Sequence, residues 1–174
     1  MRIISLLLVL TTFNLSSQEI KRVDSEKSFI NYTGKHFLHK WSAENKNISG
    51  LIQIDGESIS NIGIVAKVQD FKSGNSSLDS NSYRVLDALR IPNIVFRSTE
   101  IVDSLDLINV SGNISFHGIE KDLNVLLNKS TQNDNISLSG KFIVNLSDFN
   151  VERPSLLLQK INNEIEVQIN LIFN

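Results

Sequence analysis

Histidines are the first candidates for chemistry in this sequence, because an imidazole can bind a metal ion or move a proton. The chain has three of them, His36, His39 and His117. The spacing between His36 and His39 would suit a metal site on a helix, but both fall at the end of a predicted strand. Residues three apart on a strand point to opposite faces of the sheet. We therefore expect no metal site at this pair.

The sequence offers no clear catalytic nucleophile or acid–base pair. It contains no Gly-x-Ser-x-Gly motif that would raise a serine on a strained turn beside a histidine. The acidic residues fall in predicted loops or on outward strand faces, so they indicate no carboxylate pair of the kind that hydrolyses glycosides. We expect a protein that is not an enzyme and that uses no cofactor.

The composition is typical of one globular domain and excludes several classes of protein. Of the 174 residues, 41% are hydrophobic and 21% are charged, and the formal net charge is -2. Since no basic cluster stands out, we expect no nucleic-acid partner. The chain has no cysteine, which excludes disulfide bonds, thiolate metal sites and thiol nucleophiles.

The first 17 residues have the pattern of a secretory signal peptide. A positive charge at Arg2 is followed by the apolar run 3–13 and then by small residues that end at Ser17. The run has about eleven residues, fewer than the roughly 20 that a membrane-spanning helix needs. We expect a signal peptide over residues 1–17, a folded domain over residues 18–174, and a periplasmic or secreted location.

The elements that would position any site are strands. From residue 28 onward, apolar and polar residues alternate with a period of two, which is typical of strands with one buried face. This pattern predicts eight strands. Their inward-facing positions span Ile30 to His36, Ile48 to Ile54, Ile62 to Val68, Ile94 to Phe96, Ile108 to Phe116, Leu123 to Leu127, Ile136 to Leu146 and Ile165 to Phe173.

Turn residues separate several of these strands at hairpin distances, which predicts antiparallel pairing. They are Asp55-Gly56, His117-Gly118 and Asn133-Asp134. Between the third and fourth strands, apolar residues at helical spacing predict one short helix over residues 80–89, capped by Ser80 or Asn81 and ended by Pro92.

Eight antiparallel strands with one apolar face each can satisfy their edges by closing into an all-β barrel. A barrel of this size is either filled by its own side chains or holds one small ligand. Glycines lie in the middle of the predicted inward faces, where they either let the strands bend or leave space inside the barrel. They are Gly34, Gly50, Gly112 and Gly140.

Several segments, taken in order, resemble the YceI-like family of periplasmic lipocalin-like barrels that bind polyisoprenoid or other long-chain lipids. The most specific are Asp70–Gly74, Ile91–Ser98 with its Pro-x-Ile-x-Phe-x-Ser pattern, and Val110–Lys121 with its Val-x-Gly and His-Gly elements. The segments Tyr32–Trp41 and Gly140–Phe149 are also similar. The resemblance covers about residues 22–174 and implies an eight-stranded lipocalin-like barrel with an apolar tail inside it.

The sequence also departs from the family pattern before and within the predicted helix. The family commonly has an Arg-Asp pair and a His-Leu pair there, whereas this chain has Ser77–Asp79 and Tyr83–Leu86. We therefore do not carry over to this chain a contact between these positions and a polar headgroup.

The inward-facing residues are either plain core or the lining of a ligand tunnel. The predicted lining consists of Ile30, Tyr32, Gly34, Phe96, Val110, Gly112, Ile114, Phe142, Val144, Ile169 and Leu171. The predicted mouth, which could also be a loop that covers the core, consists of Tyr83, Leu86, Leu156, Leu157 and Leu158. A buried tail gains roughly 0.8 kcal/mol for each CH₂ group, so that binding needs no polar anchor.

Two functions are compatible with these sequence patterns. The first is a periplasmic or secreted protein that sequesters an apolar lipid, of isoprenoid, quinone or fatty-acyl type, inside the barrel and makes transient contact with a membrane at its mouth. The alternative is a filled barrel that serves as a structural or interaction module of a membrane or stress-response system. A continuous cavity of several hundred cubic ångströms would favour the first function. A homodimer is compatible with both.

Overall fold

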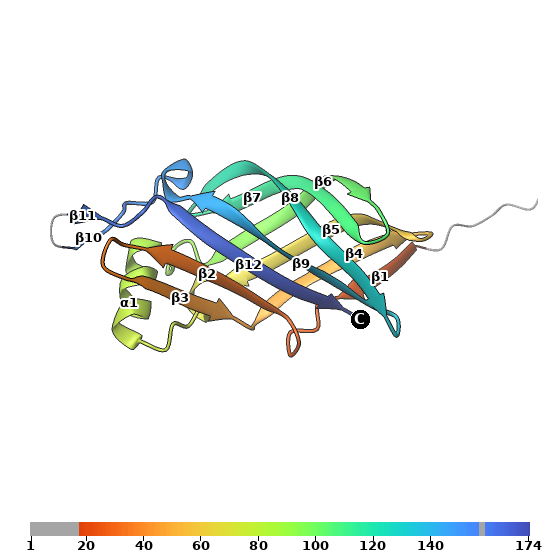
Figure 1. Ribbon diagram of the computed structural model, residues 1–174, viewed down its shortest axis with the longest axis horizontal. Coiled ribbons are helices and arrows are strands. Elements are labelled where there is room, and N and C mark those ends of the chain that lie inside the picture. Colours follow the sequence, from red (N-terminus) through yellow and green to blue (C-terminus); the bar gives the residue numbers. More distant parts are fainter. Residues whose placement is uncertain (1–17, 157–158) are drawn as a thin grey trace, which may run out of the picture.

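A computed structural model of the chain describes residues 18–156 and 159–174, apart from the side chain of Leu156. It confirms an all-β, lipocalin-like barrel with one short helix. Ten antiparallel strands form a single sheet that curls around a common interior (Figure 1). In sheet order they are β1 (Gln18–Arg22), β4 (Ile48–Asp55), β5 (Ser58–Lys67), β6 (Asn93–Asp103), β7 (Leu107–Phe116), β8 (Ile119–Gln132), β9 (Asn135–Asn145), β12 (Glu164–Phe173), β2 (Phe29–Lys35) and β3 (Lys40–Asn45).

The eight predicted strands are all present, but the prediction of eight was wrong because the sheet has two more. β1 and β3 were missed. β1 is an edge strand with one buried residue among five, so it carries no alternation to detect. β3 reads Lys-Trp-Ser-Ala-Glu-Asn, and its apolar positions are too few to indicate a strand. The connection after β9 also contains a small hairpin of β10 (Ser155–Leu156) and β11 (Gln159–Lys160).

The three predicted turns are confirmed, and their backbone explains the residue types. Gly56, His117, Gly118, Asn133 and Asp134 all have positive φ, which glycine, asparagine and aspartate tolerate better than other residues. These turns join β4 to β5, β7 to β8, and β8 to β9.

The helix lies between β5 and β6 as predicted, but its predicted limits were wrong. Helix α1 covers Ser76–Val85, so that it begins and ends about one turn earlier than expected. Its cap is Asn75, whose side-chain oxygen accepts hydrogen bonds from the backbone N–H groups of Ser77 and Leu78 at 3.0 and 3.1 Å. The helix ends before Asp87, which has a φ of 49°. Two 3-10 turns, η1 (Val68–Asp70) and η2 (Leu146–Phe149), lie elsewhere at the same end of the barrel.

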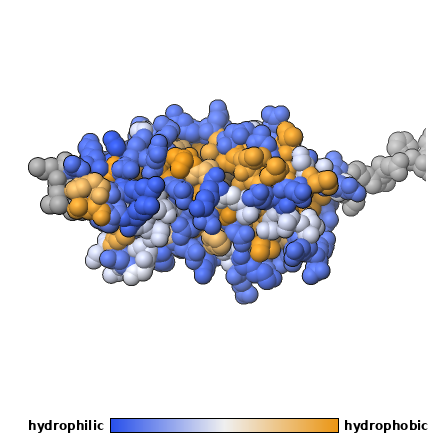
Figure 2. Space-filling model, viewed as in Figure 1, coloured by the Kyte–Doolittle hydropathy of each residue, from blue (hydrophilic) through white to orange (hydrophobic). Residues whose placement is uncertain are grey.

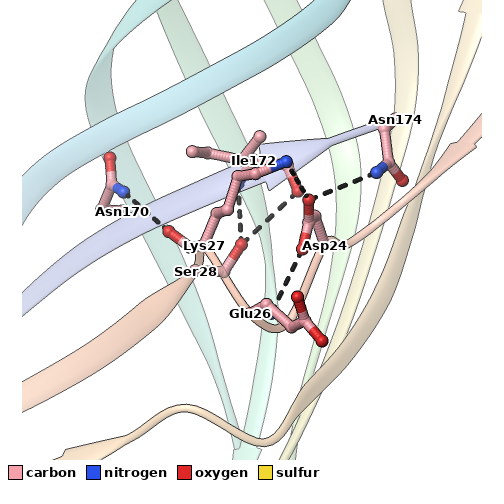
Figure 3. A network of polar contacts seen from close by, with 7 residues as sticks. All are labelled: Asp24, Glu26, Lys27, Ser28, Asn170, Ile172 and Asn174. Carbon is pink, nitrogen blue, oxygen red and sulfur yellow. Dashed lines mark hydrogen bonds and ion pairs between the residues drawn. The ribbon is translucent and has the colours of Figure 1, made fainter.

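The hydrogen-bonded sheet has two edges, β1 and β3, and neighbouring segments cover parts of both. Residues 22 and 174 exchange two backbone hydrogen bonds of 2.9 and 3.0 Å, which join the end of β1 to the end of the chain. Residues 44 and 72 exchange another pair, of 3.0 and 2.9 Å, which covers part of β3. Asp24, Lys27, Ser28, Ile172 and Asn174 add a polar network around the β1–β2 turn (Figure 3).

The interior is solid at one end of the barrel only. At the end opposite α1, Ile52, Ile108 and Phe173 have no exposed surface and belong to one large apolar cluster. At the α1 end, smaller clusters form around Phe116 and Phe149 and around Phe71. In the described part of the chain, no helix has the length and apolarity needed to cross a membrane.

Several apolar side chains point outward from the barrel. Figure 2 shows them as patches on a largely hydrophilic surface, and some lie in the region of β6 to β8. The exposed apolar residues of these strands are Val102, Leu107 and Leu126. Because they lie on the outward face, they take no part in the interior described next.

Candidate functional site: an apolar cavity in the barrel

The inward faces of the strands enclose a cavity of about 520 Å³ toward the α1 end of the barrel. This volume lies within the range of roughly 300–1,000 Å³ that small-molecule sites occupy. The walls are almost entirely aliphatic and aromatic. Several wall residues point inward but are only half-buried, which means that the barrel is hollow beside them. They are Tyr32, Ile94, Phe96, Ile114, Leu123, Phe142, Val144 and Val167.

Polar groups line the cavity mainly at its mouth. They come from α1, which contributes Asp79, Asn81 and Ser82, and from the β2–β3 hairpin, which contributes His36 and His39. The deeper wall, made by residues such as Val110 and Leu171, is apolar. The site therefore suits an amphiphilic molecule whose apolar part lies deep and whose polar part lies at the mouth.

The two histidines of the hairpin share the mouth, and the prediction that they point to opposite faces was wrong. β2 ends at Lys35, and residues 36–39 form a turn in which the His36 N–H donates to the His39 carbonyl at 2.9 Å. The turn brings the two rings within 5.9 Å of each other, centroid to centroid. Strand alternation does not apply inside a turn, which is the reason for the error.

His36 has one unused polar atom. Its Nε2 lies 3.2 Å from the carbonyl oxygen of Gln159, and because a carbonyl only accepts, Nε2 carries the proton. Nδ1 is then an acceptor, and it is buried without a hydrogen-bond partner among residues 18–156 and 159–174. Since an unpaired buried polar atom is costly, a donor from a bound molecule or a water would be stabilised here.

Helix α1 covers one side of the mouth and is held to the barrel by polar contacts. Asp79 accepts hydrogen bonds from the Ser73 N–H at 2.9 Å and from the Ser73 hydroxyl at 2.6 Å. The Tyr83 hydroxyl lies 2.8 Å from the Phe71 carbonyl oxygen and 3.0 Å from that of Gln69. No residue of α1 is fully buried. The helix therefore packs on the cavity without belonging to the core.

Tyr32 joins β2 to the helix inside the cavity. Burial raises the pKa of its phenol, and a hydrogen bond with the Ser82 side chain opposes this effect. The phenol thus stays neutral at physiological pH. Its ring packs on Phe71 with the centroids 5.6 Å apart.

Most of the predicted lining residues face the cavity. Ile30, Tyr32, Phe96, Val110, Ile114, Phe142, Val144, Ile169 and Leu171 all line it. Gly34 and Gly112 do not line the cavity. Of the two roles left open for the inward glycines, open space inside the barrel is contradicted by the close contacts at these positions. Contact of these residues with a ligand stays a prediction.

The glycines allow close approach rather than open space. A Cβ atom at Gly112 would lie 2.7 Å from the Phe96 ring, and one at Gly140 would lie 2.6 Å from the Leu127 side chain. At Gly34 the added atom would overlap the Trp41 indole. Neighbouring side chains, and at Gly112 also the backbone carbonyl of Arg97, already occupy these positions, so a larger residue there would not fit without movement.

The predicted mouth is only partly described. Tyr83 and Leu86 line the cavity. Leu156 belongs to β10, and its side chain, together with Leu157 and Leu158, lies outside the described residues.

Sequence reasoning missed the lining residues that lie outside the alternating strands. Phe71 lines the cavity just after η1, Leu78 and Val85 line it from α1, and Trp41 lines it from β3. The single tryptophan next to two histidines was the available signal. His117 lies elsewhere, with its Nδ1 2.9 Å from the Phe149 carbonyl oxygen. Among the described residues, no group of three or more His, Asp or Glu could hold a metal ion.

The comparisons with known proteins agree with this architecture. The family model described as "YceI-like domain" matches residues 22–173. No curated protein matches the chain.

Three solved structures show the same fold at low sequence identity. BcnA of Burkholderia cenocepacia has a TM-score of 0.78 at 18% identity, with 86% of this chain and 98% of that chain covered. A polyisoprenoid binding domain from Saccharophagus degradans, described as implicated in plant cell wall breakdown, has a TM-score of 0.74 at 15% identity, with 88% and 97% covered. The YCEI protein of Campylobacter jejuni has a TM-score of 0.58 at 14% identity, with 96% and 91% covered.

Proposed function

We propose that this chain, which belongs to the family of YceI-like domains, binds the apolar chain of a lipid inside its barrel. The role is sequestration or transport, without catalysis. The observation that carries this proposal is the apolar cavity of about 520 Å³, which half-buried inward residues surround. The same cavity favours a carrier over a ligand-free interaction module, because a filled barrel would bury these residues completely.

A related domain supports the choice of ligand class. The similar structure from Saccharophagus degradans is described as a polyisoprenoid binding domain. For this chain we propose an isoprenoid-type or fatty-acyl tail, with a polar group at the mouth near His36 and Asp79. Such a tail would bind mainly through burial of its methylene groups.

The volume suggests the length of tail that fits. A cavity of about 520 Å³ limits how much of a tail can be buried. Each added carbon is expected to tighten binding about fourfold, equivalent to roughly 0.8 kcal/mol, until the cavity is full. Affinities measured over a series of fatty acids and prenols should therefore rise with length and level off once the cavity is full.

Native mass spectrometry of the full chain, purified from a bacterial host after export, is the direct test. An excess mass that organic extraction assigns to one lipid per chain would support the proposal. A clean protein mass that stays unchanged after incubation with fatty acids and prenols would overturn it.

A cavity-filling variant connects the ligand to this site. Val144→Trp places a large ring in the cavity, so we expect at least about a tenfold loss of lipid affinity with the fold retained. The matched control is Ile143→Trp on the same strand, since Ile143 is half exposed and points outward. Equal loss of binding in both variants would contradict the assignment of the site.

We also propose that residues 1–17 direct the protein to the periplasm or out of the cell, as their signal-peptide pattern indicates. Cell fractionation and sequencing of the N-terminus of the recovered protein would test this. A cytoplasmic protein that keeps residue 1 would contradict it.

A further inference from the structure

The turn between β2 and β3 exposes two adjacent large apolar side chains. Phe37 is 57% exposed and Leu38 is 56% exposed. The turn between β2 and β3 lies at the α1 end of the barrel (Figure 1), and its other two residues, His36 and His39, line the cavity. Hairpin turns usually carry small or polar residues, so exposed phenylalanine and leucine at this tip need a reason.

Three basic residues flank this tip. Lys35 and Lys40 are direct cross-strand partners at the base of the turn, and both are exposed. The segment 35–41 reads Lys-His-Phe-Leu-His-Lys-Trp and contains no acidic residue. The β10–β11 hairpin adds the exposed Lys160. Its position beside the tip follows from the His36 contact with the Gln159 carbonyl and from the hydrogen bond of 2.9 Å between the Asn162 N–H and the Lys35 carbonyl.

An apolar tip flanked by three exposed lysines is complementary to the surface of an anionic bilayer. Phenylalanine and leucine can enter the boundary between headgroups and acyl chains, while lysine side chains reach the phosphates. Acidic phospholipids provide the negative charge that this segment lacks. The charge complementarity thus identifies the partner as an anionic lipid surface.

The same segment also forms part of the cavity mouth. His36, His39 and Trp41 line the cavity, whereas Phe37 and Leu38 are exposed to solvent. Seating the tip in a bilayer would therefore bring the mouth to the lipid surface. A lipid tail could then move between bilayer and cavity without full exposure to water.

We propose that the hairpin segment 35–41 is a membrane-docking element that places the cavity mouth on an anionic bilayer. The docking itself is independent of cargo, and the transfer of a lipid tail at this contact rests on the proposed function. This assignment differs from the predicted mouth at Leu156 to Leu158, because it places the contact on β2 and β3.

Flotation of the protein with phosphatidylcholine vesicles, with and without phosphatidylglycerol, tests the docking. We expect the full chain to float with the anionic vesicles and to be released by high salt. Phe37→Ser combined with Leu38→Ser should lower the fraction of protein bound to vesicles at least about tenfold, because two large apolar side chains would no longer be buried in the bilayer. Lys35→Gln with Lys40→Gln should remove the preference for phosphatidylglycerol. The matched control is Leu105→Ser, because Leu105 is 91% exposed in the β6–β7 turn at the other end of the barrel.

The outcomes separate this proposal from the proposed function. Unchanged flotation of the Phe37 and Leu38 variant, or an equal loss in the Leu105 variant, would overturn the docking proposal whether or not lipid binds inside. If docking is correct, Val144→Trp should float like the unmodified chain while it loses lipid from the cavity. Circular dichroism and thermal melting confirm that each variant is folded before it is compared.

Discussion

The indole of Trp41 on β3 lies against the backbone of Gly34, its direct cross-strand partner on β2. A Cβ atom at residue 34 would come within 2.5 Å of the indole Cε2 atom and nearer still to Cζ2. The pair explains why a glycine interrupts the apolar face of β2, because the space that a side chain would need is taken by the aromatic ring. It also sets one wall of the cavity mouth, which Trp41 lines.

Replacement of Gly34 by alanine should displace this ring. We expect Gly34→Ala to lower the free energy of unfolding by about 1–3 kcal/mol and to shift the emission of Trp41, the only tryptophan of the chain. The control is Gly63→Ala on β5, where an added Cβ meets no atom within 4 Å. Denaturant unfolding followed by fluorescence measures both effects, and equal stability of the two variants would contradict the packing described for Gly34.

The Tyr83 hydroxyl should matter for how firmly α1 covers the mouth. It lies within hydrogen-bond distance of two backbone carbonyls and accepts a hydrogen bond of 3.0 Å from Lys72, which raises the pKa of that lysine. Tyr83→Phe should lower the free energy of unfolding by about 1 kcal/mol, and the variant should release bound lipid faster. Stopped-flow displacement of a fluorescent fatty acid checks this expectation. Arg84→Ala on the same helix is the control, and matching release rates in the two variants would argue against an anchoring role for the hydroxyl.

At the other end of the barrel, Lys129 on β8 pairs with Asp103 on β6. Their side chains are only 13% and 4% exposed, and the same carboxylate accepts a hydrogen bond of 2.8 Å from the Ile59 N–H. Because loss of one partner leaves a nearly buried charge unpaired, Lys129→Met should destabilise the protein by about 3 kcal/mol. Adding Asp103→Leu should recover part of that loss, as measured by urea unfolding. Asp103→Leu alone completes the comparison. If the free energy of unfolding lost in the double variant equals the sum of the losses in the two single variants, the residues act independently.

Asp24 links stability to pH through the β1–β2 turn (Figure 3). The pKa of Asp24 is lowered mainly by a hydrogen bond of 2.7 Å from the Lys27 side chain. The charge of Lys27 and hydrogen bonds from the Glu26 and Lys27 backbone lower it further, whereas desolvation opposes these effects. The ionised carboxylate therefore stabilises the folded state fully above the pKa of an unfolded aspartate, about 3.9, and this contribution disappears as the pH falls through the lower folded value.

The prediction for Asp24→Asn is a lower Tm than that of the unmodified chain at pH 7, with the difference closing in acid below the pKa of free aspartate. Thermal melts followed by circular dichroism over this pH range measure it. Glu57→Gln, in the exposed β4–β5 turn, provides a carboxylate control. A Tm difference for Asp24→Asn that does not depend on pH would show that the charge of Asp24 is not the stabilising feature.

Much of this architecture was predictable from local pattern. Alternation with a period of two revealed eight strands and their inward faces, because burial on one side of a pleated strand leaves a direct trace in the residue order. The turns at Gly56, Gly118 and Asn133 were equally local, since their positive φ favours particular residue types. For the same reason, Phe142 and Val144 could be assigned to the interior from residue order alone.

Other features depended on contacts between residues distant in the chain. The edge strand β1 is held by pairing with β4 rather than by a pattern of its own. Residue order left open whether the inward glycines let the strands bend or leave space, and only the structure shows that Trp41, Phe96 and Leu127 approach these positions from neighbouring strands.

The mouth of the cavity shows the same difference between what local pattern predicts and what tertiary contacts decide. Residue order places His36 and His39 on opposite faces of an extended strand, whereas the turn between β2 and β3 brings their rings together beside α1. Alternation also cannot tell a filled barrel from a hollow one, because both bury the same face. The hollow at the α1 end results from how ten strands curl and pack, which is a property of the assembled sheet rather than of any single segment.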